Sequence, residues 1–269
     1  MKNSKKSAKS RGVVVFAFNT LVDYVAIADQ TSRLISHALN LPITLVTDLD
    51  SEPKFAYDNV IRMQADSNNV RGTSTTWKNL GRYQAYELSP YEETILVDTD
   101  YLVLDNSLLT LFKTEFDYRL MHHNATEDGP SHEQMGETGL PFVWATVVLF
   151  RKTERSRLFF NLVGRIQRNY PYYRALYNIR EGNYRNDYAF AIANCILSGY
   201  NLNEDQGIPW SMFTIEKKIN HIMLTDNFIQ VHYDDEATMV PYQNIHVMDK
   251  EYLQSRDFEQ VVEAICEPA

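Results

Sequence analysis

Two pairs of aspartates, each directly after an apolar run, are the residues in this chain best suited to hold a metal ion. Asp98-Thr99-Asp100 follows residues 95–97, and Asp48-Leu49-Asp50 follows residues 43–47. Side chains at i and i+2 of an extended segment point the same way, so each pair is predicted to aim two carboxylates at one point. Two such oxygen ligands suit Mg²⁺ or Mn²⁺, which then holds a phosphate or diphosphate. With 18 Asp in 269 residues, about one such motif is expected by chance, so the surrounding sequence must decide.

The apolar runs predict buried strands that alternate with helices. Residues 12–18 and 41–46 are almost continuously apolar, and residues 21–39 between them have a helical pattern. This alternation predicts an α/β sheet with right-handed crossovers, and ligands of such sheets bind at the carboxyl ends of the strands. The side chains predicted at these strand ends are Asn19, Thr20, Asp48, Asp98 and Asp100. Their convergence favours a binding site.

Two further charged residues lie on predicted helices. Arg82 belongs to a helix over residues 77–88, where it either faces a phosphate, pairs with Asp98 or is an ordinary surface residue. Asn186 is predicted to cap a helix that ends at Ser198, with Asp187 in its first turn. Asp187 is either a functional carboxylate or a charge favoured by the helix dipole. Residues 124–140, rich in Gly and polar side chains, are predicted to form a long loop.

The charge of the chain is unevenly distributed. Five of its 26 basic residues lie in residues 1–11, whereas all 35 acidic residues lie beyond them. Residues 1–11 are therefore predicted to be a disordered basic tail, and the acidic remainder is a poor passive binder of nucleic acid. No apolar run is long enough for a transmembrane helix, and no signal peptide is expected. The widely separated Cys195 and Cys266 indicate reduced thiols, so a cytoplasmic location is expected.

The order of these motifs resembles that of nucleotide-sugar-dependent glycosyltransferases of the GT-A fold, and most nearly family 8, the glycogenin/galactosyltransferase-like type. The resemblance covers roughly residues 12–245. It is carried by the strand ending in Asp48, the basic helix with Arg82, the Asp98–Asp100 motif, Arg185-Asn186-Asp187, and a late strand ending in His232. It implies a GT-A-like α/β fold: a single domain over residues 12–269, with a mixed, mostly parallel central sheet flanked by helices.

The resemblance also implies roles for individual residues. Asp98, Asp100 and His232 would bind the metal, and a histidine ligand favours Mn²⁺ over Mg²⁺. Asp187 and Arg82 would be catalytic. The nucleotide sugar would contact Phe18, Asn19, Thr20, Tyr24, Asp48, Arg82, Asp98, Thr99, Trp144 and Asn186. The sequence departs from the family at Trp144-Ala145-Thr146, and no lysine for the diphosphate follows His232 closely.

The implied activity is transfer of a hexose or pentose from a nucleoside-diphosphate sugar to an acceptor hydroxyl, with retention favoured over inversion. The acceptor would be a glycan or protein, while the basic tail leaves a modified base in phage-type DNA as another option. Two alternatives remain open at this point: a phosphohydrolase of the haloacid dehalogenase type, and a non-catalytic module that binds sugar nucleotides or glycans. A dinucleotide enzyme is disfavoured because no G-x-G-x-x-G motif follows the first strand.

Overall fold

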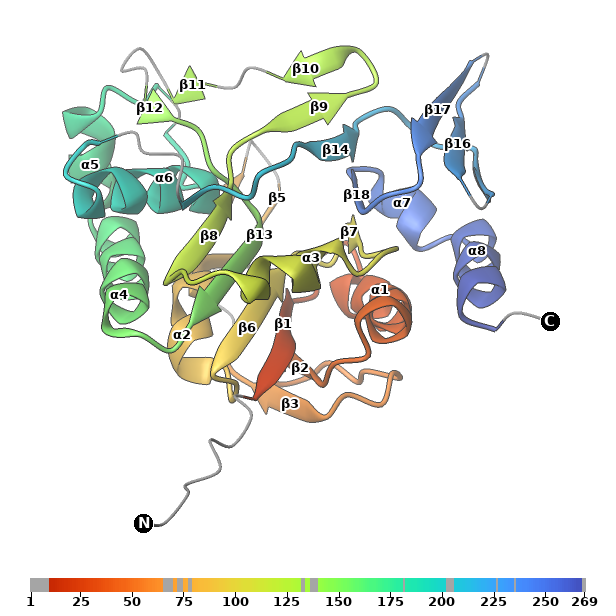
Figure 1. Cartoon of the computed structure of the whole chain (residues 1–269), viewed down its shortest axis with the longest axis horizontal. Coiled ribbons are helices and arrows are strands. Elements are labelled where there is room, and N and C mark those ends of the chain that lie inside the picture. Colours follow the sequence, from red (N-terminus) through yellow and green to blue (C-terminus); the bar gives the residue numbers. More distant parts are fainter. Residues whose placement is uncertain are drawn as a thin grey trace.

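A six-stranded sheet forms the centre of the molecule (Figure 1). In this computed structural model, the described residues are 10–64, 70–71, 75–76, 79–131, 134–135, 140–180, 182–201, 206–225, 227–234 and 236–267. From one edge to the other, the strands are β3 (Asn59–Arg62), β2 (Ile43–Thr47), β1 (Arg11–Ala17), β6 (Glu93–Val97), β13 (Trp144–Arg151) and β8 (Tyr118–Met121). The first four are parallel, and β13 runs antiparallel to both of its neighbours. The predicted mixed, mostly parallel sheet is confirmed.

Helices lie on either side of this sheet in the view of Figure 1, with α4 to α6 on the left and α1 on the right. The helical segments are α1 (Tyr24–Leu39), η1 (Asn79–Gln84), α2 (Ala85–Leu88), α3 (Ser107–Thr110), η2 (Leu111–Lys113), α4 (Glu154–Arg168), α5 (Tyr170–Leu176), α6 (Asn186–Leu197), α7 (Lys250–Leu253) and α8 (Arg256–Cys266). Helix α1 begins where the side chain of Asp23 accepts a hydrogen bond from the amide of Ala26 at 2.9 Å, which satisfies one free N–H of the first turn.

Strands from distant parts of the chain form a second, five-stranded sheet. Its order is β10 (Gly129–Ser131), β9 (Asn124–Thr126), β14 (Met212–Ile215), β18 (Ile245–Val247) and β7 (Tyr101–Leu102). The expected loop over residues 124–140 is therefore wrong in part, because its first half is the hairpin of β9 and β10. The pairing of β7 with β18 joins the segment after Asp100 to the last strand of the chain.

The remaining strands form smaller sheets. An antiparallel sheet contains β15 (His221–Leu224), β16 (Phe228–His232) and β17 (Ala237–Pro241). Two ladders of two strands pair β4 (Val70–Arg71) with β5 (Thr75–Thr76), and β11 (Gln134–Met135) with β12 (Leu140–Pro141). No helix in the described part of the chain is both long and apolar enough to cross a bilayer.

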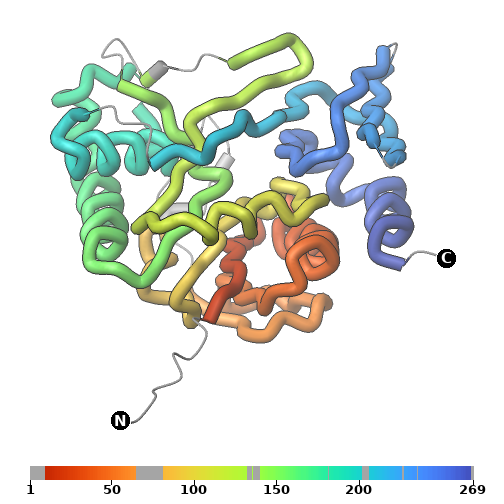
Figure 2. The backbone as a smooth tube through the Cα atoms, viewed as in Figure 1, coloured from red at the N-terminus to blue at the C-terminus, as the bar shows by residue number. Residues whose placement is uncertain are grey.

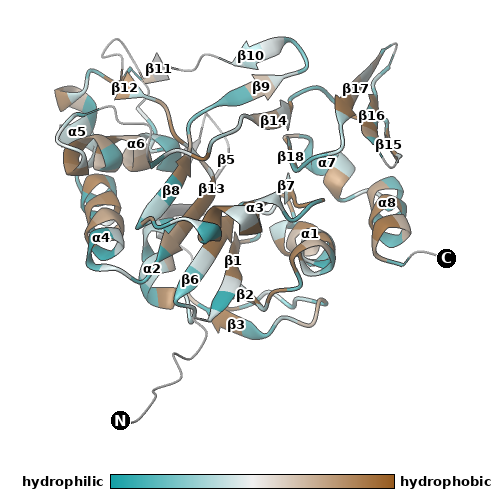
Figure 3. Ribbon diagram, viewed as in Figure 1, coloured by the Kyte–Doolittle hydropathy of each residue, from teal (hydrophilic) through white to brown (hydrophobic). Residues whose placement is uncertain are grey.

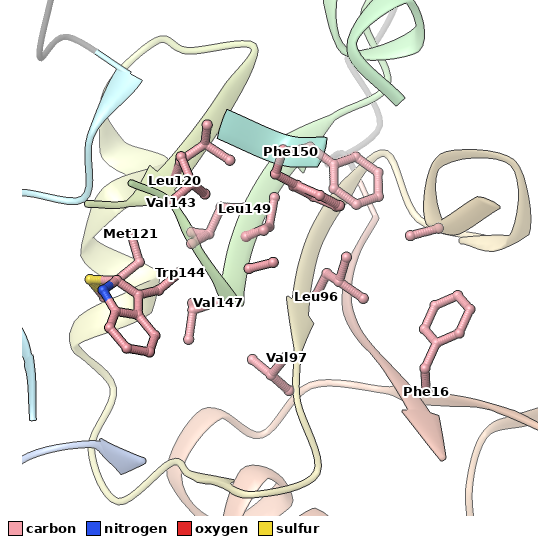
Figure 4. Close-up of a cluster of buried hydrophobic side chains, with 14 of the residues drawn as sticks. Phe16, Leu96, Val97, Leu120, Met121, Val143, Trp144, Val147, Leu149 and Phe150 are labelled. Carbon is pink, nitrogen blue, oxygen red and sulfur yellow. The ribbon is translucent and has the colours of Figure 1, made fainter. Parts of the chain in front are cut away.

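The apolar core has two parts. The larger surrounds the six-stranded sheet, whose strands are largely hydrophobic in Figure 3, and Figure 4 shows side chains of β6, β8 and β13 within it. The smaller lies between α1, the C-terminal strands and α8, and includes Ile27, Leu34 and Phe258. In Figure 2 the blue helix α8 lies to the right of α1, and Arg33 of α1 forms an ion pair with Glu267 at 3.1 Å. The two parts share α1, which supports a single domain.

The boundary of the predicted basic tail needs a correction. Arg11 is the first residue of β1, and its guanidinium forms an ion pair with the buried carboxylate of Glu93. Residues 1–9 lie outside the described part of the chain, as do Trp77 and Lys78 of the predicted helix over residues 77–88. The described part of that helix is a 3₁₀ segment followed by one α-helical turn.

Candidate active site

A pocket of about 250 Å³ opens at the carboxyl ends of β1 and β6, where ligands of α/β sheets bind. Its charged residues come from four separate segments of the chain. The lining residues are Phe16, Phe18, Tyr24, Arg82, Asp98, Thr99, Asp100, Trp144, Ala145, Thr146, Arg185, Asn186, Asp187, His246, Met248 and Lys250. We call this the first pocket.

Asp98 and Asp100 reach the first pocket from a turn rather than from an extended strand. Strand β6 ends at Val97, and the amide of Tyr101 donates to the carbonyl of Asp98 at 3.2 Å. The amide of Asp98 donates to the carbonyl of Thr146 in β13 at 2.9 Å, which fixes the start of the turn to the sheet. The predicted convergence of the two carboxylates is observed, but its expected cause, the alternation of side chains along a strand, is wrong.

Arg82 is fully buried and pairs with Asp98. One of its terminal nitrogens donates to Asp98 Oδ1, and the other donates to the carbonyls of Ala145 and Thr146 at 2.5 and 3.3 Å. A charge this deeply buried requires a partner of opposite charge, and Asp98 supplies it. Of the three roles considered for Arg82, the structure places it against Asp98 in the pocket lining.

Asp100 faces a lysine and a histidine that the sequence analysis missed. Lys250 Nζ lies 2.6 Å from Asp100 Oδ2 and also donates to the carbonyls of Val247 and Met248 at 3.0 Å each. His246 Nε2 lies 3.5 Å from the same carboxylate oxygen. The antiparallel pairing of β18 with β7 sets His246 opposite Tyr101, and so brings both basic residues to the end of the aspartate motif.

The prediction for His232 is therefore corrected. His232 ends β16 in the three-stranded sheet, where its ring lies 6.2 Å from that of His221, and it does not line the first pocket. The expected pattern, a histidine in a late strand followed by a lysine, is present fourteen residues later at His246 and Lys250. That spacing was the signal that could have identified both.

The two carboxylates have opposite pKa shifts. Burial, and after it the charge of Asp100, raise the pKa of Asp98 above its ordinary value against the opposing charge of Arg82. Burial also acts on Asp100, but the charges of Lys250 and His246 outweigh it and hold the pKa of Asp100 below its ordinary value. Two carboxylates this close ionise as a coupled pair, and the nearby cations favour ionisation of Asp100 first.

Asp187 contributes a third carboxylate from the first turn of α6. Its Oδ1 accepts from the amide of Ala145 at 3.0 Å, and its Oδ2 accepts from Arg185 at 2.8 and 3.0 Å. The guanidinium of Arg185 lies over the rings of Phe142 and Tyr188. Both oxygens of Asp187 are therefore held by hydrogen-bond donors, which fix the orientation of its carboxylate. Asn186 is the first residue of α6 rather than its cap, which is Arg185.

Aromatic side chains also contribute to the wall of the first pocket. Phe16 and Phe18 come from the end of β1 and Tyr24 from the start of α1, while Trp144 begins β13. The rings of Trp144 and Phe142 meet edge to face at 5.1 Å, so the indole is fixed in place. Phe16 and Trp144 are both visible in Figure 4. Such surfaces suit a base or a sugar ring.

Three predicted nucleotide contacts lie outside the first pocket. Asn19 and Asp48 line a second, larger hollow of about 760 Å³ at the ends of β1 and β2, together with Asp23, Asp29 and Asp50. Thr20 lines neither hollow, and its hydroxyl accepts from the amide of Val22 at 3.3 Å. The other residues predicted to contact the nucleotide sugar all line the first pocket, around the turn that holds Asp98 and Asp100.

The side chains around Asp100 offer oxygen and nitrogen atoms that could bind a metal ion. Asp100 Oδ1 is buried and has no hydrogen-bond partner, and the nearby His246 Nε2 and Asp98 complete a set of oxygen and nitrogen donors typical of Mn²⁺ or Mg²⁺. Among the described residues, no group of three His, Cys, Asp or Glu side chains already stands close enough together to hold an ion. The chemistry of the residues fits a divalent cation, while Asp98 Oδ1 pairs with Arg82 and Asp100 Oδ2 pairs with Lys250.

Comparisons with known proteins found only structural similarity. No family model matches the chain, and no curated protein matches it. An active-site mutant of LgtC superposes with a TM-score of 0.46 at 15% identity over 67% of this chain and 69% of that one. The galactosyltransferase LgtC in complex with donor and acceptor sugar analogs gives 0.45 at 16% identity, over 68% of this chain and 70% of that one.

The glycosyltransferase GlyE of Streptococcus pneumoniae TIGR4 gives a TM-score of 0.40 at 16% identity, over 76% of this chain and 46% of that one. This chain thus spans less than half of the GlyE structure. At these identities and TM-scores, the function has to be inferred from the first pocket itself.

Proposed function

We propose that this chain is a glycosyltransferase that takes its sugar from a nucleoside-diphosphate sugar with the help of Mn²⁺ or Mg²⁺. One observation carries the proposal: the first pocket places Asp98 and Asp100 beside Arg82 and Lys250, at the carboxyl edge of the sheet. Cations are the groups that bind a diphosphate and stabilise the charge it gains as the bond to the sugar breaks. An enzyme that only hydrolyses phosphate esters would have less use for the aromatic side chains of the first pocket than one that binds a nucleotide sugar.

Asp98, Asp100 and His246 would hold the metal ion. When bound, the ion supplies positive charge that neutralises the leaving nucleoside diphosphate. Arg82 pairs with Asp98 and Lys250 pairs with Asp100, so both cations would contribute to binding the diphosphate. Phe16, Phe18 and Tyr24 would hold the nucleoside, and Trp144 would exclude water from the donor sugar.

Asp187 would act as a charged group rather than as a base. Both of its oxygens already accept hydrogen bonds, from the Ala145 amide and from Arg185, and these hold the carboxylate in one orientation. Its negative charge would instead stabilise the positive charge that develops on the donor sugar, and would orient the sugar. This role agrees with a retaining reaction. We propose a glycan or protein hydroxyl as the acceptor, with a modified DNA base as the less favoured class.

The test is release of nucleoside diphosphate from a panel of nucleotide sugars, with Mn²⁺, Mg²⁺ or EDTA. We expect one donor to be turned over only with a divalent cation, and Asp100→Asn to abolish this turnover. Asp50→Asn is the matched control, because it makes the same change in the other aspartate motif and should leave the rate unchanged. Nucleotide binding without turnover would instead identify a non-catalytic module, and phosphate release from a simple phosphomonoester would favour a phosphohydrolase.

A further inference from the structure

His246 is held on both sides of its ring by residues of neighbouring strands. Its Nδ1 lies 3.2 Å from the hydroxyl of Thr214, and its Nε2 lies 3.5 Å from Asp100 Oδ2. Thr214 and His246 are direct partners in the parallel pairing of β14 with β18, and His246 is in turn opposite Tyr101 of β7. The second sheet therefore fixes where the two ring nitrogens point.

The hydroxyl of Thr214 has its single proton engaged elsewhere. It donates to Asn124 Oδ1 at 2.7 Å, and both residues are almost fully buried, with exposed fractions of 0% for Thr214 and 3% for Asn124. A hydroxyl has only one donor, so with its proton given to Asn124 Oδ1 the oxygen of Thr214 is left to accept from His246 Nδ1. In the neutral ring the proton then sits on Nδ1, and Nε2 keeps its lone pair.

The geometry on the other side of the ring agrees with this assignment. The 3.5 Å between His246 Nε2 and Asp100 Oδ2 is longer than the roughly 2.7–3.2 Å of a usual N–H···O hydrogen bond. Asp100 therefore holds Nε2 less closely than Thr214 holds Nδ1, which lies at 3.2 Å. His246 and Asp100, whose Oδ1 has no hydrogen-bond partner, both line the first pocket.

We propose that Asn124 and Thr214 are positioning residues that fix the Nδ1-protonated tautomer of His246, so that Nε2 is ready to bind a divalent cation beside Asp100. Neither residue lines the first pocket, and both act only through the ring of His246. The ligand role of Nε2 rests on the proposed function, whereas the tautomer is a property of the metal-free protein. The two can be tested separately.

The tautomer can be read directly by NMR. Long-range ¹H–¹⁵N correlations of the histidine rings, recorded on metal-free protein at a pH where the ring is neutral, distinguish a protonated from a bare nitrogen. His246→Gln identifies the signals of His246. We expect a protonated Nδ1 in the wild type and in Thr214→Ser, which keeps the hydroxyl. Asn124→Ala removes the acceptor, frees the Thr214 proton for Nδ1, and should move the ring proton to Nε2.

Mn²⁺ affinity is the second measurement, made by electron paramagnetic resonance of the free ion. Loss of an outer hydrogen bond to a ligating histidine typically weakens metal binding by about 10- to 100-fold, and we expect this for Asn124→Ala. Thermal unfolding shows whether the variant is folded. A proton on Nε2 of the wild type, or an unchanged tautomer in Asn124→Ala, would overturn the positioning role of Asn124 and Thr214. This holds whether or not Mn²⁺ binds. The expected tautomers without Mn²⁺ binding by the wild type would overturn the proposed metal site and the ligand role of Nε2.

Discussion

The two aspartate motifs have the same spacing and both follow strands of one sheet, yet their surroundings are opposite. Asp98 and Asp100 face Arg82, Lys250 and His246. Asp48 instead accepts from the amide of Asn19 at 3.0 Å and from the hydroxyl of Ser51 at 2.6 Å. The first motif is matched by charges, and the second by neutral donors, one from its own loop and one from the end of β1.

The difference extends to the basic residues of each region. Arg82 is fully buried and donates to a carboxylate, whereas Arg62 is exposed and donates to the carbonyls of Asp48, Leu49 and Ser51. A motif that holds a ligand needs charges that the ligand can replace or complement, whereas one that shapes a loop needs only hydrogen bonds. The spacing of two aspartates therefore carries little information until their partners are known.

The arginine pair should give the largest contrast. Arg82→Met leaves Asp98 without its partner in the pocket, and we expect the free energy of unfolding to fall by about 3 kcal/mol, since breaking a buried ion pair typically costs that much. Arg62→Met removes hydrogen bonds that water can replace, so the loss should stay below about 1 kcal/mol. Urea denaturation of both variants measures the difference. Equal losses would show that the two regions are alike in their energetics.

The two lysines test the same contrast in activity. Lys250 lies against Asp100 in the first pocket, while the exposed Lys54 lines the second hollow. We expect Lys250→Met to lower kcat/KM for the donor about 100-fold, equivalent to about 2.7 kcal/mol of transition-state stabilisation. Lys54→Met should leave kcat/KM unchanged. Initial rates of nucleoside diphosphate release provide the measurement, and a similar loss in both variants would argue that the donor extends into the second hollow.

Much of this architecture was predictable because short apolar runs in the sequence indicate its buried strands. Apolar runs identified β1, β2 and β6, and the carboxyl ends of β1 and β6 located the first pocket. His246 and Lys250 were not found because β18 reaches Asp100 only through pairing with β7, more than 140 residues earlier in the chain. No local pattern encodes such a pairing, and β16, which ends in a histidine, fitted the expected late strand.

The path of the chain after β6 was a second limit. Asp98 and Asp100 converge as predicted, but the prediction assumed an extended strand. The segment instead turns at Thr99, and this turn brings the two side chains together. Asn19, Asp48 and Asp98 all follow parallel strands, but the sheet is wide enough that two hollows share its carboxyl edge. Strand order decides which residues share a site, and strand order is set by tertiary packing.

Asp48→Asn gives the smallest effect and the sharpest test of the division between the two hollows. Burial alone would raise the pKa of Asp48, but the hydrogen bonds from Ser51 and from the Asn19 amide outweigh it and hold the pKa below the ordinary value of 3.8. The folded protein therefore binds fewer protons than the unfolded chain around and below pH 3.8, so the contribution of Asp48 to stability is complete above that pH and is lost on acidification.

At pH 7 we expect Asp48→Asn to lower the free energy of unfolding by about 1 kcal/mol, because it weakens two hydrogen bonds of the loop. The gap between variant and wild type should close as the pH falls through the lowered pKa of Asp48, which urea denaturation between pH 7 and pH 3 would follow. Donor turnover at pH 7 should change little. If turnover were lost while stability and its pH dependence stayed the same, Asp48 would contact the nucleotide after all, and the two hollows would have to be one donor site.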